Sequence, residues 1–155
     1  MVEVHVATEA YVDDVVELER RLFAEDSGRH DRHADVDWPA REGAQDFADL
    51  LANPDAIVFL ARAERRSVGL LMGYTAVAGT TRKPVRSAVL RSMYVTTDAR
   101  RTGVASALIT EFLDWARRTG CVEAQVDHFV ANTSAGELYE SSGFEVHALT
   151  RVAHL

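Results

Sequence analysis

The sequence has little cysteine, no long apolar run and no excess of positive charge. Its one cysteine, Cys121, excludes an internal disulfide. No apolar run reaches the length of a membrane span, and residues 1–5 lack the basic and apolar regions of a signal peptide. The formal net charge of −7 argues against nucleic acid as the main partner and favours cationic partners. We therefore expect a cytoplasmic protein that contacts neither a membrane nor nucleic acid.

The 155 residues suit a single domain over residues 1–155 with a sizeable core. Short β-branched and apolar runs predict strands, and apolar residues at helical spacing predict helices. The expected strands are 2–6, 56–62, 68–77, 85–95, 122–130 and one or two more within 145–153, and the expected helices are 8–24, 39–52, 104–119 and 133–142. Short connections predict that the second to fourth strands are antiparallel. A helical connection predicts that the fifth is parallel to the fourth.

The junction between the fourth strand and the next helix is the most informative stretch. There Arg100 and Arg101 precede Gly103, which lets a ligand approach the backbone closely. A helix start carries free N–H groups and the positive end of a dipole, so it suits an anion. Arginines at this position oppose the dipole unless a phosphate neutralises them. The pattern indicates a pyrophosphate site, and the alternative is an ordinary surface arginine pair.

The apolar period stops in residues 25–38, which are rich in aspartate. Asp35 and Asp37 precede Trp38, and together they suit the mouth of a site for a cationic acceptor. The alternative is a solvated acidic loop. His30 and His33 have a spacing that can hold a metal, but no cysteine accompanies them, so we predict no metal site.

Two motifs resemble landmarks of the GCN5-related N-acetyltransferase (GNAT) family. Arg100-x-x-Gly103-x-Ala105 matches the signature R/Q-x-x-G-x-G/A, with Ala105 at the position of the last glycine. Further along, the run from Asn132 to Phe144 matches N-x-x-A-x-x-L-Y-x-x-x-G-F. The resemblance is strong over residues 88–145, and Thr97 stands where many members have proline.

This resemblance implies a mixed α/β fold with a central, mostly antiparallel twisted sheet of six to seven strands and about four flanking helices. Its parallel fourth and fifth strands part at their ends, helped by a bulge in the fourth, and the pantetheine arm of acetyl-CoA lies between them. The implied cofactor contacts are Met93, Tyr94, Val95, Arg100, Arg101, Thr102, Gly103, Val104, Ala105, Ser106 and Asn132. The alternative role of Asn132 is to cap the following helix.

The implied reaction is attack of a primary amine on the acetyl-CoA thioester, for which the amine must lose a proton. Tyr139 matches the family tyrosine that protonates the leaving thiolate, and its alternative role is only to orient the thioester. His128 and Asp127 are candidates for the base. Because they are neighbours in an expected strand, they point to opposite faces, and only one can face the cleft. A water relay to solvent is the other possibility.

Two functions follow from the sequence. The first is an acetyl-CoA-dependent N-acetyltransferase for a small cationic amine, with aminoglycosides, polyamines, amino acids and peptide N-termini all open as acceptors. The second is a non-catalytic CoA-binding sensor or interaction module. The intact Tyr139 favours the enzyme, since a module that only binds has no chemical need of it. Members of this fold often dimerise, so a homodimer is compatible with either function.

Overall fold

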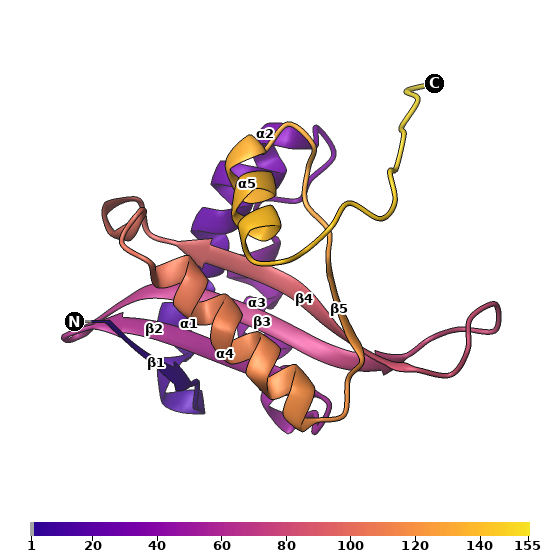
Figure 1. Cartoon of the computed structure of the whole chain (residues 1–155). Coiled ribbons are helices and arrows are strands. Elements are labelled where there is room, and N and C mark those ends of the chain that lie inside the picture. Colours follow the sequence, from indigo (N-terminus) through magenta and orange to yellow (C-terminus); the bar gives the residue numbers. More distant parts are fainter. Residues whose placement is uncertain (1) are drawn as a thin grey trace.

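The structure is a computed structural model that describes residues 2–155, and it consists of one sheet with helices on both faces (Figure 1). The strands are β1 (Val2–Val6), β2 (Ala56–Ala63), β3 (Arg66–Val77), β4 (Arg86–Val95) and β5 (Glu123–Val126). The helices are α1 (Val12–Leu22), α2 (Gly28–His30), α3 (Trp38–Ala52), α4 (Val104–Arg118) and α5 (Thr133–Ser141). Short 3-10 turns occupy Glu9–Tyr11 and Thr97–Ala99, and a π-helical turn occupies Phe23–Ser27.

The sheet has the strand order β1-β2-β3-β4-β5. The pairs β1–β2, β2–β3 and β3–β4 are antiparallel, and the pair β4–β5 is parallel. The lengths of the connections predicted the directions from β2 to β5. The mixed α/β class is therefore confirmed. The expected number of six to seven strands is wrong, since the sheet of the described residues contains five.

The predicted strands after α4 are shorter than expected or do not form. β5 ends at Val126 and not at residue 130, and residues 145–155 contain no strand. The apolar alternation of that tail is real, but Val146 and Val152 are 95% and 75% exposed. Alternation sets which face a side chain takes, whereas a strand also needs a neighbouring backbone to pair with. The tail has no such neighbour among residues 2–155.

A bulge interrupts β4 at Arg91. Met72 pairs with Ser92 and Gly73 pairs with Leu90, so Arg91 is an extra residue opposite β3. A bulge of this kind bends the strand and re-aims its side chains. The bulge that the family resemblance implied for the fourth strand is therefore present.

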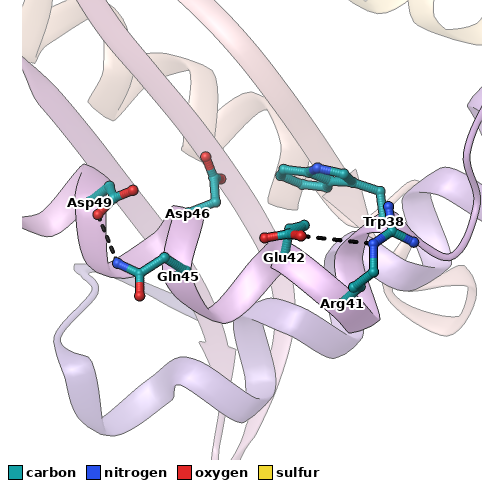
Figure 2. A pocket seen from close by; sticks show the side chains of 6 residues that line it. All are labelled: Trp38, Arg41, Glu42, Gln45, Asp46 and Asp49. Carbon is teal, nitrogen blue, oxygen red and sulfur yellow. Dashed lines mark hydrogen bonds and ion pairs between the residues drawn. The ribbon is translucent and has the colours of Figure 1, made fainter.

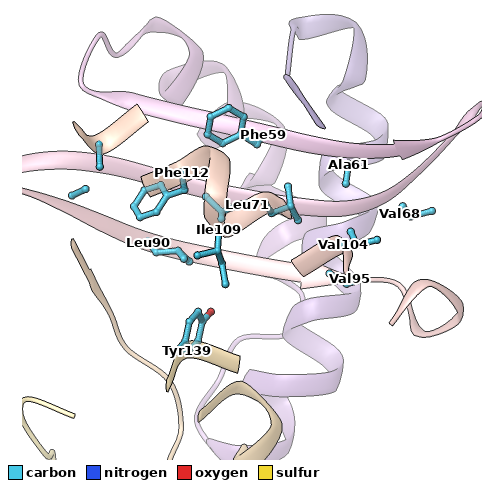
Figure 3. Close-up of a cluster of buried hydrophobic side chains, with 13 residues drawn as sticks. Phe59, Ala61, Val68, Leu71, Leu90, Val95, Val104, Ile109, Phe112 and Tyr139 are labelled. Atoms are coloured by element: carbon cyan, nitrogen blue, oxygen red, sulfur yellow. The ribbon is translucent and has the colours of Figure 1, made fainter. Parts of the chain in front are cut away.

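Two apolar clusters cover the two faces of the sheet. The cluster on the α4 face contains Leu108 and Phe112, both fully buried, together with Leu71 of β3, and Tyr139 of α5 belongs to it (Figure 3). The other cluster joins α1 and α3 to the sheet through Val15 and Phe47. The sheet is thus covered by α4 on one face and by α1 with α3 on the other (Figure 1).

The first helix does not end near residue 24 as predicted. It continues through the π-helical turn Phe23–Ser27 into α2, which ends at His30. Loss of the apolar period marked the end of its buried stripe, but an exposed helical turn needs no such stripe.

Among residues 2–155, no helix is both long enough and apolar enough to cross a membrane.

Candidate active site

The turn between β4 and α4 has the geometry expected of an anion site. Arg101 and Gly103 have positive φ angles of 61° and 88°, and Gly103 is the N-cap of α4. Ala107 N donates to Gly103 O, so the N–H groups of residues 104–106 have no intrahelical partner. A Cβ added at Gly103 would meet no atom within 4 Å. Open space therefore lies beside a helix start that carries partial positive charge.

The two arginines of this turn differ in their surroundings. Arg100 Nε donates to the carbonyl of Val95 at 3.0 Å, and its Nη2 pairs with Glu25 at 2.6 Å. Its guanidinium also lies 5.5 Å from the centre of the Tyr94 ring. Arg101 is exposed. The sequence analysis predicted that both arginines neutralise a phosphate. In the structure Arg100 contacts β4, whereas Arg101 is open to solvent.

The end of β4 has a free edge on the side of β5. Parallel pairing stops at Leu90 and Val126, so β4 continues for five residues without this neighbour. Thr96 N donates to Val68 O of β3. Because backbone groups alternate along a strand, the N–H groups of Met93 and Val95 point to the free side. This is the parting of the fourth and fifth strands that the family resemblance implied.

Tyr139 lies on α5, and its ring is buried between other rings. Its side chain is only 8% exposed, with the rings of His128 and Phe144 centred 5.8 and 5.7 Å away. Burial, and then the negative charge of Asp26, raise the pKa of Tyr139 to about 12. The phenol therefore stays protonated at neutral pH and remains a hydrogen-bond donor.

His128 and Asp127 lie in the loop after β5 and not in a strand as predicted. Strand alternation therefore does not decide their directions. His128 stacks on Tyr139, and its Nδ1 lies 3.0 Å from the carbonyl oxygen of Phe129. A carbonyl oxygen can only accept, so Nδ1 is the donor in this contact, and in the neutral ring the lone pair is on Nε2. Asp127 is exposed and makes no hydrogen bond or ion pair with any residue of 2–155.

Asn132 uses both ends of its side-chain amide. Its Oδ1 accepts from Ala135 N at 3.1 Å and so caps α5, which was the alternative role predicted from the sequence. Its Nδ2 donates to Asp26 Oδ1 at 3.0 Å.

The predicted acceptor residues Asp35, Asp37 and Trp38 have different surroundings. Asp35 forms an ion pair, Asp37 is exposed, and Trp38 lines a groove. Asp35 accepts from Arg41 at 2.7 Å, and this guanidinium lowers the pKa of Asp35. Asp37 is exposed and precedes α3. Trp38 stacks on Phe23 at 5.7 Å. It lines an open groove of about 380 Å³ along α3 together with Arg41, Glu42, Gln45, Asp46 and Asp49 (Figure 2).

This groove is connected to the bulge of β4. Arg91 donates to both carboxylate oxygens of Asp46, at 3.2 and 2.5 Å, and lies 3.5 Å from Glu19 of α1. Burial raises the pKa of Glu19 to about 7, and the positive charge of Arg91 opposes this rise.

Within residues 2–155, no group of three or more His, Cys, Asp or Glu side chains is arranged to hold a metal ion.

The sequence profile of the acetyltransferase (GNAT) family matches residues 12–144. The chain belongs to this family. An aminoglycoside N(6')-acetyltransferase type 1 from Acinetobacter haemolyticus is 28% identical over 142 residues, which are 90% of this chain and 88% of that protein. One from Serratia marcescens is 31% identical over 114 residues, 69% of this chain and 77% of that protein. The solved structure of aminoglycoside N-acetyltransferase AAC(6')-Iy in complex with CoA has a TM-score of 0.81 at 18% identity, covering 100% of this chain and 95% of that one.

The prediction of a GNAT-type acetyltransferase is thereby confirmed at the level of the family. The third comparison shows that a protein with this fold binds CoA.

Several polar residues near the free edge of β4 and the groove on α3 were not predicted from the sequence. Glu42, Asp46 and Asp49 recur at spacings of four and three, which places them on one face of a helix, and that signal was available. Glu25 and Asp26 had no such signal, because their partners come from β4, the turn after it and the loop before α5.

Proposed function

We propose that this protein is an acetyl-CoA-dependent N-acetyltransferase whose acceptor is a small polycationic amine of the aminoglycoside class. One observation carries the proposal. The free edge of β4 runs toward the start of α4, whose first N–H groups are unpaired, and the buried, protonated Tyr139 lies in the same apolar cluster as Val95 of β4. We also propose that residues 1–155 work as one domain, because the cluster around α4 includes Val4 near one end and Phe144 near the other.

The chain's residues fit acetyl-CoA. The N–H groups of Met93 and Val95 face the free side of β4 and suit the amides of a pantetheine arm, which would pair with them like an added strand. The helix start at residues 103–106, with open space beside Gly103, suits the pyrophosphate. Arg101 adds charge from the solvent side, whereas Arg100 positions the turn through Val95 and Glu25.

Acetyl-CoA supplies a thioester, whose acyl carbon accepts the amine and whose sulfur leaves as a thiolate. The backbone N–H groups at the end of β4 are suited to stabilise the charge that develops on the carbonyl oxygen. The Tyr139 hydroxyl is suited to donate to the leaving sulfur. Since its pKa of about 12 exceeds the pKa of about 8.5 of an ordinary thiol, we assign it a hydrogen-bond donor role that stabilises the developing thiolate.

His128 is the base that we propose. Its ring stacks on Tyr139 at the exposed mouth of the site, and its Nε2 has the lone pair that can take a proton from the acceptor ammonium, directly or through water. Asp127 is its neighbour in an exposed loop, and we assign it a supporting electrostatic role.

The acidic groove on α3 is the acceptor surface that we propose. Glu42 and Asp49 line it with Trp38, and Asp46 joins it to the bulge at Arg91, where the free edge of β4 begins. Carboxylates at this spacing suit an acceptor with several ammonium groups. The relatives named above are aminoglycoside acetyltransferases, which supports the same class of acceptor. Asp35 and Asp37 lie directly before the groove and extend its negative field.

A panel of amines tests the proposal. The protein is incubated with acetyl-CoA and, separately, an aminoglycoside with a 6'-amine, an aminoglycoside without one, spermidine, amino acids and a short peptide. Thiol release and the mass of the acceptor are then measured. We expect acetylation of the first compound and little of the others. Binding of acetyl-CoA without acetylation of any amine would instead favour the non-catalytic CoA-binding module.

A further inference from the structure

The segment after β5 is attached to the rest of the protein by very few polar contacts. Val126 is the last residue that pairs in the sheet. Among the described residues, those from 127 to 155 make hydrogen bonds only with one another, with one exception. The exception joins Asn132 Nδ2 to Asp26 Oδ1 at 3.0 Å, across 106 positions of sequence. Apolar contacts of Leu138, Tyr139 and Phe144 hold the segment otherwise.

Asp26 lies on the π-helical turn Phe23–Ser27 that continues α1. Its neighbour Glu25 accepts from the Tyr94 hydroxyl at 2.9 Å and from Arg100 at 2.6 Å, so it fixes this turn to the end of β4. Asp26 fixes the same turn to the start of α5. Two consecutive carboxylates therefore connect the end of β4 to the start of α5 through one helical turn. π-Helical turns are rare and are frequent at functional sites.

The geometry of Asn132 transmits this connection to Tyr139. Because Oδ1 caps Ala135 N, the amide can offer only Nδ2 to Asp26, which fixes the direction of the side chain. Tyr139 comes seven residues later, close to two full helical turns, so it lies on the same side of α5 as its cap. His30 Nε2 lies 3.7 Å from Asp26, and its ring lies 5.4 Å from that of Phe129 in the preceding loop.

We propose that Asp26 is a positioning residue. Through Asn132 it holds α5, and with it Tyr139, at its working distance from the end of β4. The role rests on the proposed donor function of Tyr139. Asp26 itself need not touch the acetyl group or the amine. Removal of the link would let α5 shift on its apolar contacts, and a shift of about 1 Å at a reacting group can lower a rate by about a hundredfold.

An exchange of the two partners tests the link. Asn132→Asp keeps an oxygen that caps Ala135 N but replaces the donor to Asp26 with a second carboxylate. The double variant Asp26→Asn/Asn132→Asp restores one donor and one acceptor in reversed order. We expect kcat to fall about tenfold or more in Asn132→Asp and to recover to within about threefold of wild type in the double variant. The Kd of CoA should change less than kcat in both.

Hydrogen exchange gives a readout that does not depend on catalysis. The amides of residues 133–141 should exchange faster in Asn132→Asp and return to the wild-type rate in the double variant. Asp13→Asn is the matched control, because Asp13 is an exposed carboxylate on α1 that makes no hydrogen bond or ion pair with any residue of 2–155. It should change neither kcat nor the exchange of α5.

Three results would overturn the positioning role. The first is a double variant no better than Asn132→Asp in kcat and in exchange. The second is a recovery of exchange without a recovery of kcat, which would leave Asp26 a purely structural residue. The third is a wild-type kcat in Tyr139→Phe. This last result would remove the donor role of Tyr139, and with it the catalytic reason for the link, while the exchange data would still report the link itself.

Discussion

At the scale of single residues, Tyr139 and Glu19 show two consequences of burial. Both carry a hydroxyl or carboxyl group that burial keeps protonated beyond its usual pH range. For Tyr139 the result is a donor at neutral pH, in the cluster that also contains Val95 of β4. For Glu19 the result is a carboxyl group whose Oε2 accepts no hydrogen bond from any residue of 2–155. The first bears on catalysis and the second on stability.

We expect Tyr139→Phe to lower kcat by about a hundredfold and to leave the Kd of CoA nearly unchanged, because only the donor to the leaving sulfur is lost. The ring contacts with His128 and Phe144 are kept by phenylalanine. Steady-state kinetics and calorimetric titration with CoA measure the two quantities. A raised KM with an unchanged kcat would show that the ring only orients the thioester.

We expect the free energy of unfolding to decrease as pH rises from about 4.5 to about 7, because of Glu19. Its pKa is about 7 in the folded protein against 4.5 ordinarily, so in this window the folded state holds a proton that the unfolded state has lost. The loss is on the order of 3 kcal/mol. Urea unfolding at several pH values should show a flatter dependence in Glu19→Gln.

Glu17→Gln is the matched control for this experiment. Glu17 lies on the same helix, but hydrogen bonds from Arg20 and Arg21 lower its pKa to about 2, below the window tested. Its replacement should leave the slope between pH 5 and 7 unchanged. Equal slopes in wild type and Glu19→Gln would show that Glu19 does not hold a proton in the folded state.

At the scale of elements, the start of α4 depends on backbone conformation more than on side chains. Gly103 takes a φ of 88° that disfavours other residues, and its missing side chain leaves space beside the free N–H groups. Arg101 also takes a positive φ. The pyrophosphate site that we propose is therefore mainly a property of the main chain, which explains why Arg100 can be committed to Glu25 and Val95.

We expect Gly103→Asp to abolish most of the rise in Tm that acetyl-CoA causes, and Gly103→Asn to retain much of it. Both side chains tolerate a positive φ, and only aspartate adds a negative charge to the proposed pyrophosphate site. The Kd of CoA should be about tenfold higher in Gly103→Asp than in Gly103→Asn, which is about 1.4 kcal/mol. Thermal unfolding with and without acetyl-CoA measures this difference.

Gly79→Asp serves as the control for charge alone. A side chain at Gly79 also meets open space, but this glycine lies in the loop between β3 and β4. It should respond to acetyl-CoA like wild type. Equal responses of the two Gly103 variants would place the pyrophosphate elsewhere.

At the scale of the whole molecule, the net charge of −7 favours cationic partners. The groove on α3 carries Glu42, Asp46 and Asp49 together with Arg41. Arg91 engages Asp46, and Arg41 lies 3.8 Å from Glu42. Exposed charges of this kind attract cations over a screening length of about 8 Å at physiological salt. The field of the molecule therefore favours association with a multiply charged amine.

We expect kcat/KM for an aminoglycoside to fall as salt increases, and Glu42→Gln/Asp49→Asn to raise the acceptor KM about threefold to tenfold with little change in the Kd of CoA. The control is Glu3→Gln/Glu64→Gln, which removes the same charge beside β1 and β2. Initial rates against salt concentration measure both effects. Equal acceptor KM values in the two double variants would show that the groove does not bind the acceptor.

Much of the fold was predictable because its signals are local. The alternation of residues 85–95 and the helical spacing after Gly103 predicted β4 and α4, and the connection lengths predicted strand direction. The same reasoning failed for residues 145–153. There the apolar alternation was present, but pairing depends on a neighbouring strand that a sequence pattern does not specify. The sheet consequently has fewer strands than expected.

The sequence by itself determined the elements around the site and the residue types in its motifs, because periodicity, glycine and capping act over a few neighbouring residues. Only the tertiary structure decided which side chains meet. Glu25 reaches Arg100, Asp26 reaches Asn132, and Arg91 reaches Asp46, each across 45 or more positions. Such pairs form only after the sheet and helices are packed, since the contacts that bring distant segments together are made by apolar residues elsewhere in the chain.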